Sequence, residues 1–485
     1  MLPVQSTLPF SDYSSLYDLL VPKTNLLRQI NDLVDFSFIR KELLAKYCSD
    51  NGRTAECPIR MFKYLLLKII YDLSDVDVVE HSLYDLSFKY FLGMAPEDTS
   101  LINPSSLCKF RKLRLQDNGL MNLLIEKTVS IAVEKGIIKS RTIIVDSTHT
   151  GSRSNPYSSV DVLKLRSKQL RKVIYDFDDE VKGSLPEKNE DNDLSHELKY
   201  TRDLVDAVSS NAVLSNVPKI KERLNMLKEV ADDIEDHYTT SKDTDARTGH
   251  KSEDDSFFGY KTHIAMSDER IITAAIVTSG EKGDGPQLEE LVKQSRENGM
   301  EVETVVGDTA YSGKDNIILS QDEEKGFELV AQLHPVISHG FRKEEDKFEF
   351  NKDAGMFVCP AGHMAVRKAC QGKKGQGVNR TMVYFFDVDK CRNCSRRKGC
   401  YKEGANSKSY SVQIKSEEHK RQESFQNTEE FKEKARVRYK IEAKNAELKY
   451  VLGYDRATSY GMDCMRMQGA LTIFVANLKR ILKLS

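Results

Sequence analysis

Residues 141–150 read RTIIVDSTHT, and the β-branched run in this stretch predicts a strand that ends on a carboxylate. Threonine, isoleucine and valine favour strands, whereas aspartate is uncommon in them. A buried charge is costly unless it is paired or binds a metal ion. Asp146 therefore either caps the strand at the surface or binds a cation at the edge of a sheet.

A second stretch repeats this pattern. Residues 303–313 read ETVVGDTAYSG, in which Asp308 follows a short run of strand-forming residues and precedes a threonine. If both strands lie in one sheet, the two carboxylates converge at its edge, where they repel each other unless a cation joins them. Hard oxygen ligands favour Mg²⁺ or Mn²⁺. The alternative is that each aspartate only caps its own strand.

A third acid is expected on a helix over residues 431–452. Arg438, Glu442 and Lys449 project from such a helix within about 40° of one another. A neighbouring apolar stripe consists of Val437, Ile441, Leu448 and Leu452. Because this stripe would bury against the sheet, Glu442 is placed where it could reach a site, with Arg438 and Lys449 beside it as phosphate ligands. The alternative is a solvated helix with an ordinary Arg–Glu pair.

The rest of the central region alternates strand and helix patterns. Strands are expected over 259–267 and 271–280 as a hairpin, and over 327–335, with an amphipathic helix over 287–298. The fold class is therefore an α/β core. His263 could line the site, although a lone histidine in a strand is more often structural. Residues 151–255 read as a helical insertion with an acidic turn.

Residues 12–138 have a helical pattern. The segment NPSSLCKFRKLRL (103–115) predicts a capped helix that carries Arg111 and Lys112. A series of short helices in which one of the last is basic is typical of helix-turn-helix DNA-binding domains. A plain helical bundle fits the same pattern equally well.

The cysteines gather in one basic segment. Cys359 is followed by the spacing Cys391-x2-Cys394-x5-Cys400, which predicts a structural zinc site. Arg396 and Arg397 lie between these cysteines and are candidates for contact with DNA phosphates. His363 or Cys370 could replace one ligand, and the alternative is a set of free thiols.

The composition is typical of a soluble globular protein. Its 485 residues are 30% charged and 39% hydrophobic, with a net charge of −1 and nine cysteines. No apolar run reaches the roughly 18 residues of a membrane span, and no secretory signal is visible, so no membrane partner and a cytoplasmic location are expected. The charge is segregated: residues 361–421 are basic and residues 176–193 are acidic.

The order Asp146, Asp308, Glu442 on strand, strand and helix resembles the DDE transposases of bacterial insertion sequences, which have a ribonuclease-H-like core. A related group carries Tyr-x2-Arg-x3-Glu-x6-Lys around the last acid, and this chain has Arg438-x3-Glu442-x6-Lys449, with Ala435 at the tyrosine position. LSDVDVVEHSLYDLSFKYFLGM (73–94) and SLCKFRKLRL (106–115) are similar to the InsH-like helical N-terminal domain of these enzymes, and GYKTHIAMS and VVGDTAYSG are similar to their core segments.

This resemblance implies a DNA transposase that binds terminal inverted repeats and catalyses Mg²⁺-dependent strand cleavage and strand transfer. Asp146, Asp308 and Glu442 would bind two Mg²⁺ or Mn²⁺ ions. The partners would be double-stranded DNA of the element ends and of the target, and a homodimer or higher assembly would act in the synaptic complex. The location would be the bacterial cytoplasm, with the nucleoid. Related transposases also carry a similar Cys-rich insertion, which implies Zn²⁺ at Cys359, Cys391, Cys394 and Cys400.

Three parts of the chain are expected. They are a helical DNA-binding domain over 1–138, a ribonuclease-H-like core over 139–340 and 426–485 that contains the 151–255 insertion, and a basic Cys-rich insertion over 341–425. Three other functions stay open. They are a metal-dependent nuclease or resolvase without strand transfer, a non-catalytic DNA-binding regulator derived from a transposase, and a metal-dependent hydrolase of small molecules.

Overall fold

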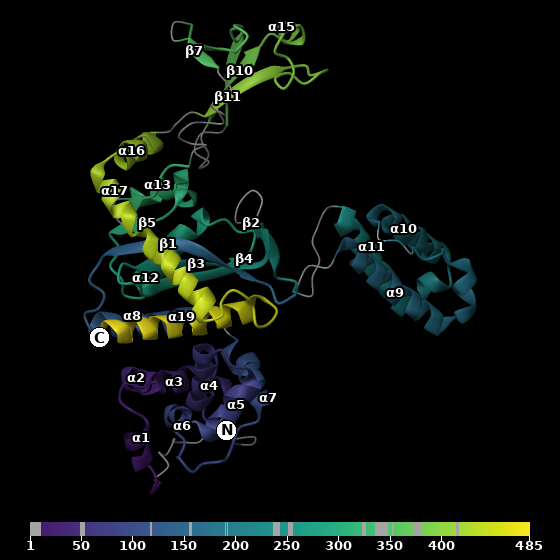
Figure 1. The fold of residues 1–485 in the computed structure, drawn as a ribbon. Helices are drawn as coiled ribbons and strands as arrows, with labels where there is room; N and C mark the ends of the chain where they lie inside the picture. Colours follow the sequence, from purple (N-terminus) through teal and green to yellow (C-terminus); the bar gives the residue numbers. More distant parts are fainter. Residues whose placement is uncertain are drawn as a thin grey trace.

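The computed structural model describes residues 11–48, 54–116, 119–154, 158–189, 191, 193–235, 243–250, 256–322, 326–334, 348–351, 354–372, 380–413 and 417–485. Figure 1 shows N-terminal helices beneath a central sheet, and two insertions that lie apart from it. Residues 335–347 and 414–416, at the boundaries of the Cys-rich insertion, lie outside the described residues. No helix among the described residues is long and apolar enough to cross a membrane.

The first part of the chain is helical, as predicted. Its helices are α1 (Ser15–Leu20), α2 (Leu26–Leu33), α3 (Ser37–Leu43), α4 (Pro58–Tyr71), α5 (Asp75–Tyr84), α6 (Leu86–Leu92), α7 (Pro104–Phe110) and α8 (Leu120–Glu134). Local sequence explains where several of them begin. Ser74 and Asp77 form a reciprocal capping box at the start of α5, and Pro58 occupies the first turn of α4.

The central sheet has six strands in the described part of the chain. They are β1 (Thr142–Gly151), β2 (Arg247–His250), β3 (Ser256–Ser267), β4 (Ile272–Ser279), β5 (Thr304–Val306) and β6 (Glu328–Val330). The order is β2-β3-β1-β5-β6, and β4 also pairs with β3. β3 runs antiparallel to β1 and β4, whereas β5 runs parallel to β1 and β6. This mixed sheet is consistent with a ribonuclease-H-like core.

Alternate side chains of the strands enter two different cores. Ile144 and Ile264 pack with α8 and with α19 (Met462–Leu484) on one face. Ile143, Val145 and Ala265 pack with α12 (Leu288–Glu297) and α13 (Lys314–Ser320) on the other. The sheet is therefore covered on both faces at this level, which explains the uninterrupted apolar runs 143–145 in β1 and 264–266 in β3.

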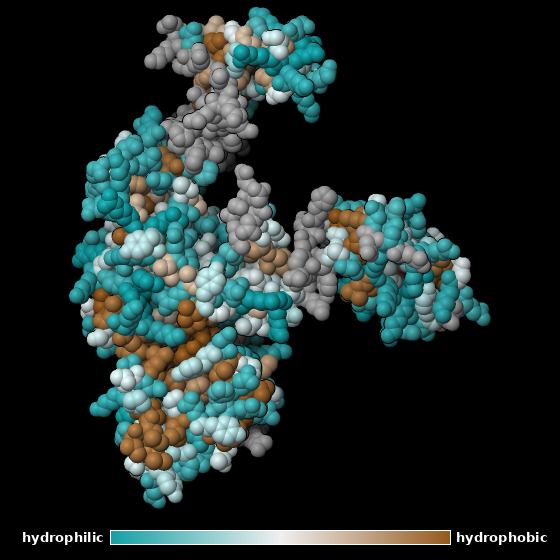
Figure 2. Space-filling model, in the orientation of Figure 1, coloured by the Kyte–Doolittle hydropathy of each residue, from teal (hydrophilic) through white to brown (hydrophobic). Residues whose placement is uncertain are grey.

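The N-terminal helices share the first of these cores. The ring of Phe62 on α4 lies 6.1 Å from that of Phe474 on α19 in an edge-to-face arrangement. Figure 2 shows apolar residues at the level where the N-terminal helices meet α8 and α19. Hydrophobic packing is thus continuous from the N-terminal helices to the sheet.

The C-terminal helix differs from the expected continuous helix. It is divided into α17 (Glu429–Ala435), a 3₁₀ turn (Arg436–Arg438), α18 (Tyr439–Ala446) and a π-helical turn (Glu447–Val451). α18 contacts β1 beyond the residues that pair with β5. Because β5 is much shorter than β1, one edge of β1 is open there, and α18 lies along it.

The insertions have their own small cores. A bundle of α9 (Ser159–Phe177), α10 (Leu194–Ser210) and α11 (Pro218–Glu235) separates β1 from β2. The Cys-rich module has β7 (Glu349–Asn351), β8 (Met356–Val358), β9 (Arg367–Gln371), β10 (Thr381–Phe386), α15 (Val388–Arg392) and β11 (Lys408–Gln413), and α16 (Glu417–Gln426) follows it. Figure 2 shows both insertions as largely hydrophilic on the viewed face.

Candidate active site

Strand register brings Asp146 and Asp308 to the same edge of the sheet. Ile144 of β1 pairs with Val306 of β5 in parallel. Asp146 lies two residues after Ile144, and Asp308 lies two residues after Val306. Two equal steps along parallel neighbouring strands end at the same level, so the two side chains lie at one point of the sheet edge.

The carboxylate of Asp146 is held by two donors. The Ser147 backbone N–H donates to Oδ1 over 2.8 Å, and Nδ2 of Asn445 on α18 donates to Oδ2 over 3.1 Å. Burial raises the pKa of Asp146 to about 6, and the negative charges of Asp308 and Asp284 add to this increase. The negative charges of Asp308 and Asp284 thus both act on Asp146 at this edge.

Asp308 begins a tight turn that the sequence did not reveal. Its Oδ1 accepts the backbone N–H of Ala310 over 2.9 Å, which caps the 3₁₀ turn Thr309–Tyr311. This turn directs Tyr311 back into the protein, where its side chain is fully buried. The ring packs on Gly307, where an added Cβ would lie 2.7 Å from a ring carbon. The GDTAY segment is therefore one folded unit around Asp308.

Asp284 is a third carboxylate near the pair, and no sequence pattern pointed to it. Its Oδ1 lies 3.0 Å from Nζ of Lys261 and 3.3 Å from Nδ1 of His263. Burial alone would raise the pKa of Asp284, but hydrogen bonds from His263 and Lys261 lower it to about 2. His263 is fully buried and its Nε2 lies 2.9 Å from Oγ1 of Thr278, so it fixes Asp284 from inside the sheet.

Glu442 does not join Asp146 and Asp308 in this structure. Its side chain is 60% exposed, and its Oε1 lies 3.5 Å from Nη2 of Arg438. Among the described residues, no group of three or more His, Cys, Asp or Glu is arranged to hold a metal ion. The expectation that three acids meet at one point is therefore not met here. The physical reason is local, because the positively charged Arg438 lies one helical turn before Glu442 and pairs with it.

Comparison with protein families shows which family the chain belongs to. A family described as Transposase domain (DUF772) matches residues 15–113, and a family described as Transposase DDE domain matches residues 230–478, just over half of the chain. The chain belongs to the DDE transposase family. Comparisons with curated proteins and with solved structures found no match. As a DDE transposase it is a phosphoryl-transfer enzyme that acts on DNA with a divalent metal ion.

The DDE match contains some of the site residues and not others. Asp284, Asp308 and Glu442 lie within the matched range, whereas Asp146 on β1 precedes it. The place of Asp146 in the transposase site therefore stays a prediction, for which the strand register and the charge of Asp308 are the evidence. The three-helix bundle lies between Asp146 and most of the matched range, which explains why the two are far apart in the sequence.

The predicted phosphate-binding residues of the transposase lie in different settings. The charge of Arg438 lowers the pKa of Asp146, so this side chain lies close to the aspartates, and its buried Nε has no hydrogen-bond partner among the described residues. Nζ of Lys449 lies 3.3 Å from Nε2 of His149 on β1, and the His149 ring is 4.8 Å from that of Phe257. Their contact with phosphate stays a prediction.

Arg111 has a structural partner that sequence analysis missed. Nη1 of Arg111 donates to Oδ1 of Asp75 over 2.9 Å, its Nη2 pairs with the other oxygen, and Nζ of Lys68 lies 2.8 Å from the same carboxylate. These side chains are only about a quarter exposed. Arg111 thus ties the π-helical turn after α7 (Arg111–Leu115) to the start of α5, while Lys112 is exposed. DNA contact by either residue stays a prediction.

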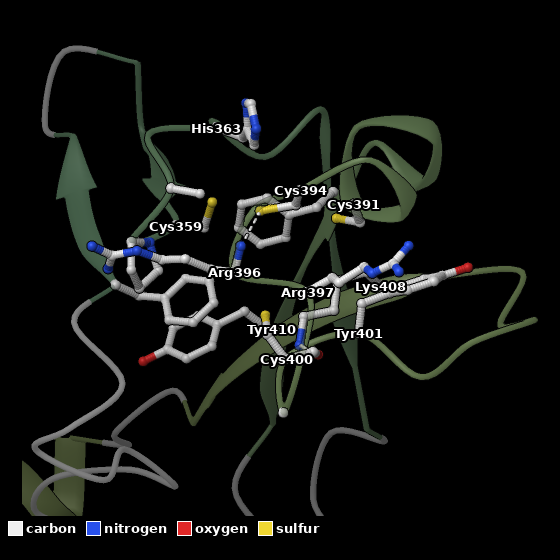
Figure 3. A pocket seen from close by; sticks show the side chains of 15 residues that line it. Cys359, His363, Cys391, Cys394, Arg396, Arg397, Cys400, Tyr401, Lys408 and Tyr410 are labelled. Atoms are coloured by element: carbon white, nitrogen blue, oxygen red, sulfur yellow. Dashed lines mark hydrogen bonds between the residues drawn. The ribbon is translucent and has the colours of Figure 1, made fainter.

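The zinc site expected in the Cys-rich module of the transposase is not confirmed. Cys359, Cys391, Cys394 and Cys400 line one cavity of about 330 Å³, together with His363, Arg396 and Arg397 (Figure 3). Cys370 is not among the lining residues. The four thiols share this cavity, but in the described chain they do not form the metal-binding arrangement that the spacing predicted.

The thiols of this cavity interact with one another and with their own loop. Burial and the neighbouring thiols of Cys400 and Cys359 raise the pKa of Cys391. Sγ of Cys394 accepts the backbone N–H of Arg396 over 3.4 Å within its own loop. Figure 3 shows the two arginines beside the cysteines, so the cavity has a basic wall.

Proposed function

We propose that this transposase binds the terminal inverted repeats of its own element and catalyses DNA strand cleavage and strand transfer, with Asp146, Asp308 and Glu442 as its catalytic acids. The observation that carries the proposal is the register of β1 and β5, which puts Asp146 and Asp308 at one level of the sheet edge. Their electrostatic interaction supports it independently, because the charge of Asp308 raises the pKa of Asp146.

The residues at this edge fit the divalent cation that the family implies. Both aspartates offer hard oxygen ligands, and the repulsion between them is relieved by a positive ion. The buried Oδ1 of Asn445 has no hydrogen-bond partner among the described residues, and Nδ2 of the same amide donates to Asp146. Two bound Mg²⁺ or Mn²⁺ ions would activate the attacking oxygen and stabilise the leaving oxygen.

Each side chain then has a separate task. Ser147 and Asn445 hold Asp146 in one orientation, and the Ala310 N–H holds Asp308. Arg438 releases Glu442 when a DNA phosphate replaces the glutamate as its partner, because a planar guanidinium binds phosphate in a bidentate manner. Glu442, which is largely exposed, is then free to turn toward the aspartates.

Basic residues outside the site would bind the rest of the DNA. Lys449 on the open edge of β1, Lys112 on the N-terminal helices, and Arg396 and Arg397 in the Cys-rich module are candidates for phosphate contacts. Such contacts add affinity without reading sequence. Two element ends must be held together for joining, so we propose that the active form is a homodimer or a higher assembly.

The test uses a duplex that carries the inverted repeats flanking the reading frame, with Mg²⁺ and a target plasmid. Asp308→Asn should lose both cleaved and joined products while it still shifts the duplex in a binding gel. Asp315→Asn, an exposed acid at the first turn of α13, is the matched control and should behave like the unchanged protein. Cleaved but never joined DNA would indicate a nuclease, and binding without any cleavage would indicate a regulator; either result contradicts the proposal.

A further inference from the structure

The hydroxyl of Tyr311 is buried without a hydrogen-bond partner. The Tyr311 side chain is fully buried, and within the described chain its Oη has neither a donor nor an acceptor. A buried tyrosine normally finds a partner, because an unpaired hydroxyl loses its hydrogen bonds to water. An exception next to a candidate active site therefore points to a partner that binds during function.

Tyr311 lies close to the acids of this edge, because it belongs to the turn that Asp308 caps and the segment after Asp284 packs on that turn. Burial raises the pKa of Tyr311, and the carboxylates of Asp284, Asp146 and Asp308 raise it further. All three acids of this edge therefore act on the phenol group. The same surroundings keep the phenol protonated, so Tyr311 is present as a hydrogen-bond donor beside three acceptors.

The backbone around Tyr311 is fixed. Nδ2 of Asn316 donates to the carbonyl of Tyr311 and to the carbonyl of Gly285, each over 3.0 Å. An added Cβ at Gly285 would lie 2.7 Å from the carbonyl oxygen of Ala310, so the segment after Asp284 packs directly on the turn after Asp308. The phenol ring itself lies against Gly307. Tyr311 cannot leave the site without breaking these contacts.

We propose that Tyr311 is a positioning residue of the cation site, and that its hydroxyl donates a hydrogen bond to the Asp146–Asp308 carboxylate pair when a divalent cation draws the two acids together. This inference rests on the proposed function of the same site. Without a cation the acids repel one another and none lies within reach of the hydroxyl. With a cation the acids converge, and a fixed donor behind them orients their oxygens. Asp284, held by Lys261 and His263, stays in place as a third negative charge.

The test compares Tyr311→Phe with the unchanged protein, because this substitution removes only the hydroxyl. Binding of Mn²⁺ is titrated by the electron paramagnetic resonance signal of the free ion, and thermal unfolding is followed with and without Mn²⁺. We expect the affinity of Tyr311→Phe for Mn²⁺ to fall about tenfold, as for other residues that orient metal ligands. Without metal, its melting temperature should be unchanged or higher, because the unpaired hydroxyl is gone.

Tyr454→Phe is the matched control. Tyr454 is also fully buried, but its hydroxyl already pairs with Oγ1 of Thr262 over 2.8 Å. This variant should melt at a lower temperature without metal and bind Mn²⁺ as tightly as the unchanged protein. If Tyr311→Phe shows that same pattern, Tyr311 is merely structural and the inference is overturned.

Asp308→Asn separates this inference from the proposed function. If Asp308→Asn weakens Mn²⁺ binding but Tyr311→Phe does not, the metal site stands and only the role of Tyr311 is overturned. If the unchanged protein binds no Mn²⁺ at millimolar concentration, both the metal site and the role of Tyr311 are overturned. Weaker binding by both variants, with an unchanged or higher melting temperature for Tyr311→Phe without metal, supports the proposal.

Discussion

The Nη2 atom of Arg438 lies 3.5 Å from Oε1 of Glu442, so the proposed phosphate ligand and the proposed third metal ligand are paired with each other. Binding of DNA is therefore expected to break this pair. Arg438→Gln frees Glu442 but loses the bidentate phosphate contact, and DNA cleavage should fall about 10–100-fold, the usual loss for a charge-assisted hydrogen bond. Arg438→Lys keeps the charge and should retain part of the activity. Cleavage rates of element ends measure both, and an unchanged rate for Arg438→Gln would contradict the prediction.

Asp146 should make stability depend on pH in a metal-free buffer. Its pKa in the folded protein is about 6, above the ordinary value of 3.8, so between these values the folded state binds the proton more tightly than the unfolded chain. The stability that Asp146 contributes is full at low pH and is lost as pH rises through about 6. Asp146→Asn cannot ionise, so at about pH 7.5 its free energy of unfolding should exceed that of the unchanged protein by up to about 3 kcal/mol.

Urea unfolding with a chelator present measures this difference across the pH range. The two proteins should converge below about pH 3, where Asp146 is protonated in both states. Mn²⁺ should stabilise the unchanged protein and leave Asp146→Asn unaffected, because only a carboxylate offers the charged ligand. A constant difference between the two curves would show that Asp146 is not the titrating group.

Gly307 is needed for the turn around Asp308. Alanine there would put a Cβ 2.7 Å from a ring carbon of Tyr311 and 3.0 Å from a methyl group of Val145. Gly307→Ala should lower the free energy of unfolding by about 1–3 kcal/mol, as overpacking of a core does, and should slow DNA cleavage. Gly313→Ala, where nothing lies within 4 Å of an added Cβ, is the control and should be close to neutral. Equal effects of the two substitutions would remove the steric argument.

Substitutions of the adjacent residues Arg111 and Lys112 should have different effects, one on stability and the other on DNA binding. Arg111→Met breaks a half-buried ion pair with Asp75 and should lower the free energy of unfolding by about 1–3 kcal/mol. Lys112→Ala should leave stability unchanged, weaken DNA binding, and reduce the salt dependence of binding by about one phosphate contact. Thermal unfolding and binding at several salt concentrations distinguish the two. If the Arg111→Met protein is as stable as the unchanged protein but binds DNA weakly, Arg111 binds DNA and the predicted structural role is wrong.

Local sequence predicted the two aspartates because each one follows a short apolar run that forms a strand. Asp146 comes directly after Val145, and Asp308 comes after Val306 with Gly307 between them. The extent of β1 was not predictable: it continues to Gly151 because its polar residues still pair with β3. Pairing between segments a hundred residues apart is a tertiary effect that local propensity does not contain.

The remaining site residues were hidden for the same reason. Asp284 is recognisable only by its contacts with Lys261 and His263, and Tyr311 only by the turn that buries it. Glu442 was expected at the border of the buried face, but the breaks before and after α18 leave it exposed beside Arg438. Cysteine spacing predicted a zinc site, but metal binding depends on side-chain orientations that spacing does not determine.

The contact between Phe62 and Phe474 limits how this protein can be divided. Deleting residues 1–138 would uncover Phe474 and the apolar face of α19 that the N-terminal helices now cover. A truncated fragment with that face in water would tend to aggregate. The N-terminal helices and the core that carries the acids are therefore expected to function only as one unit, and a chimera of two such enzymes would need matched apolar side chains where α4 meets α19.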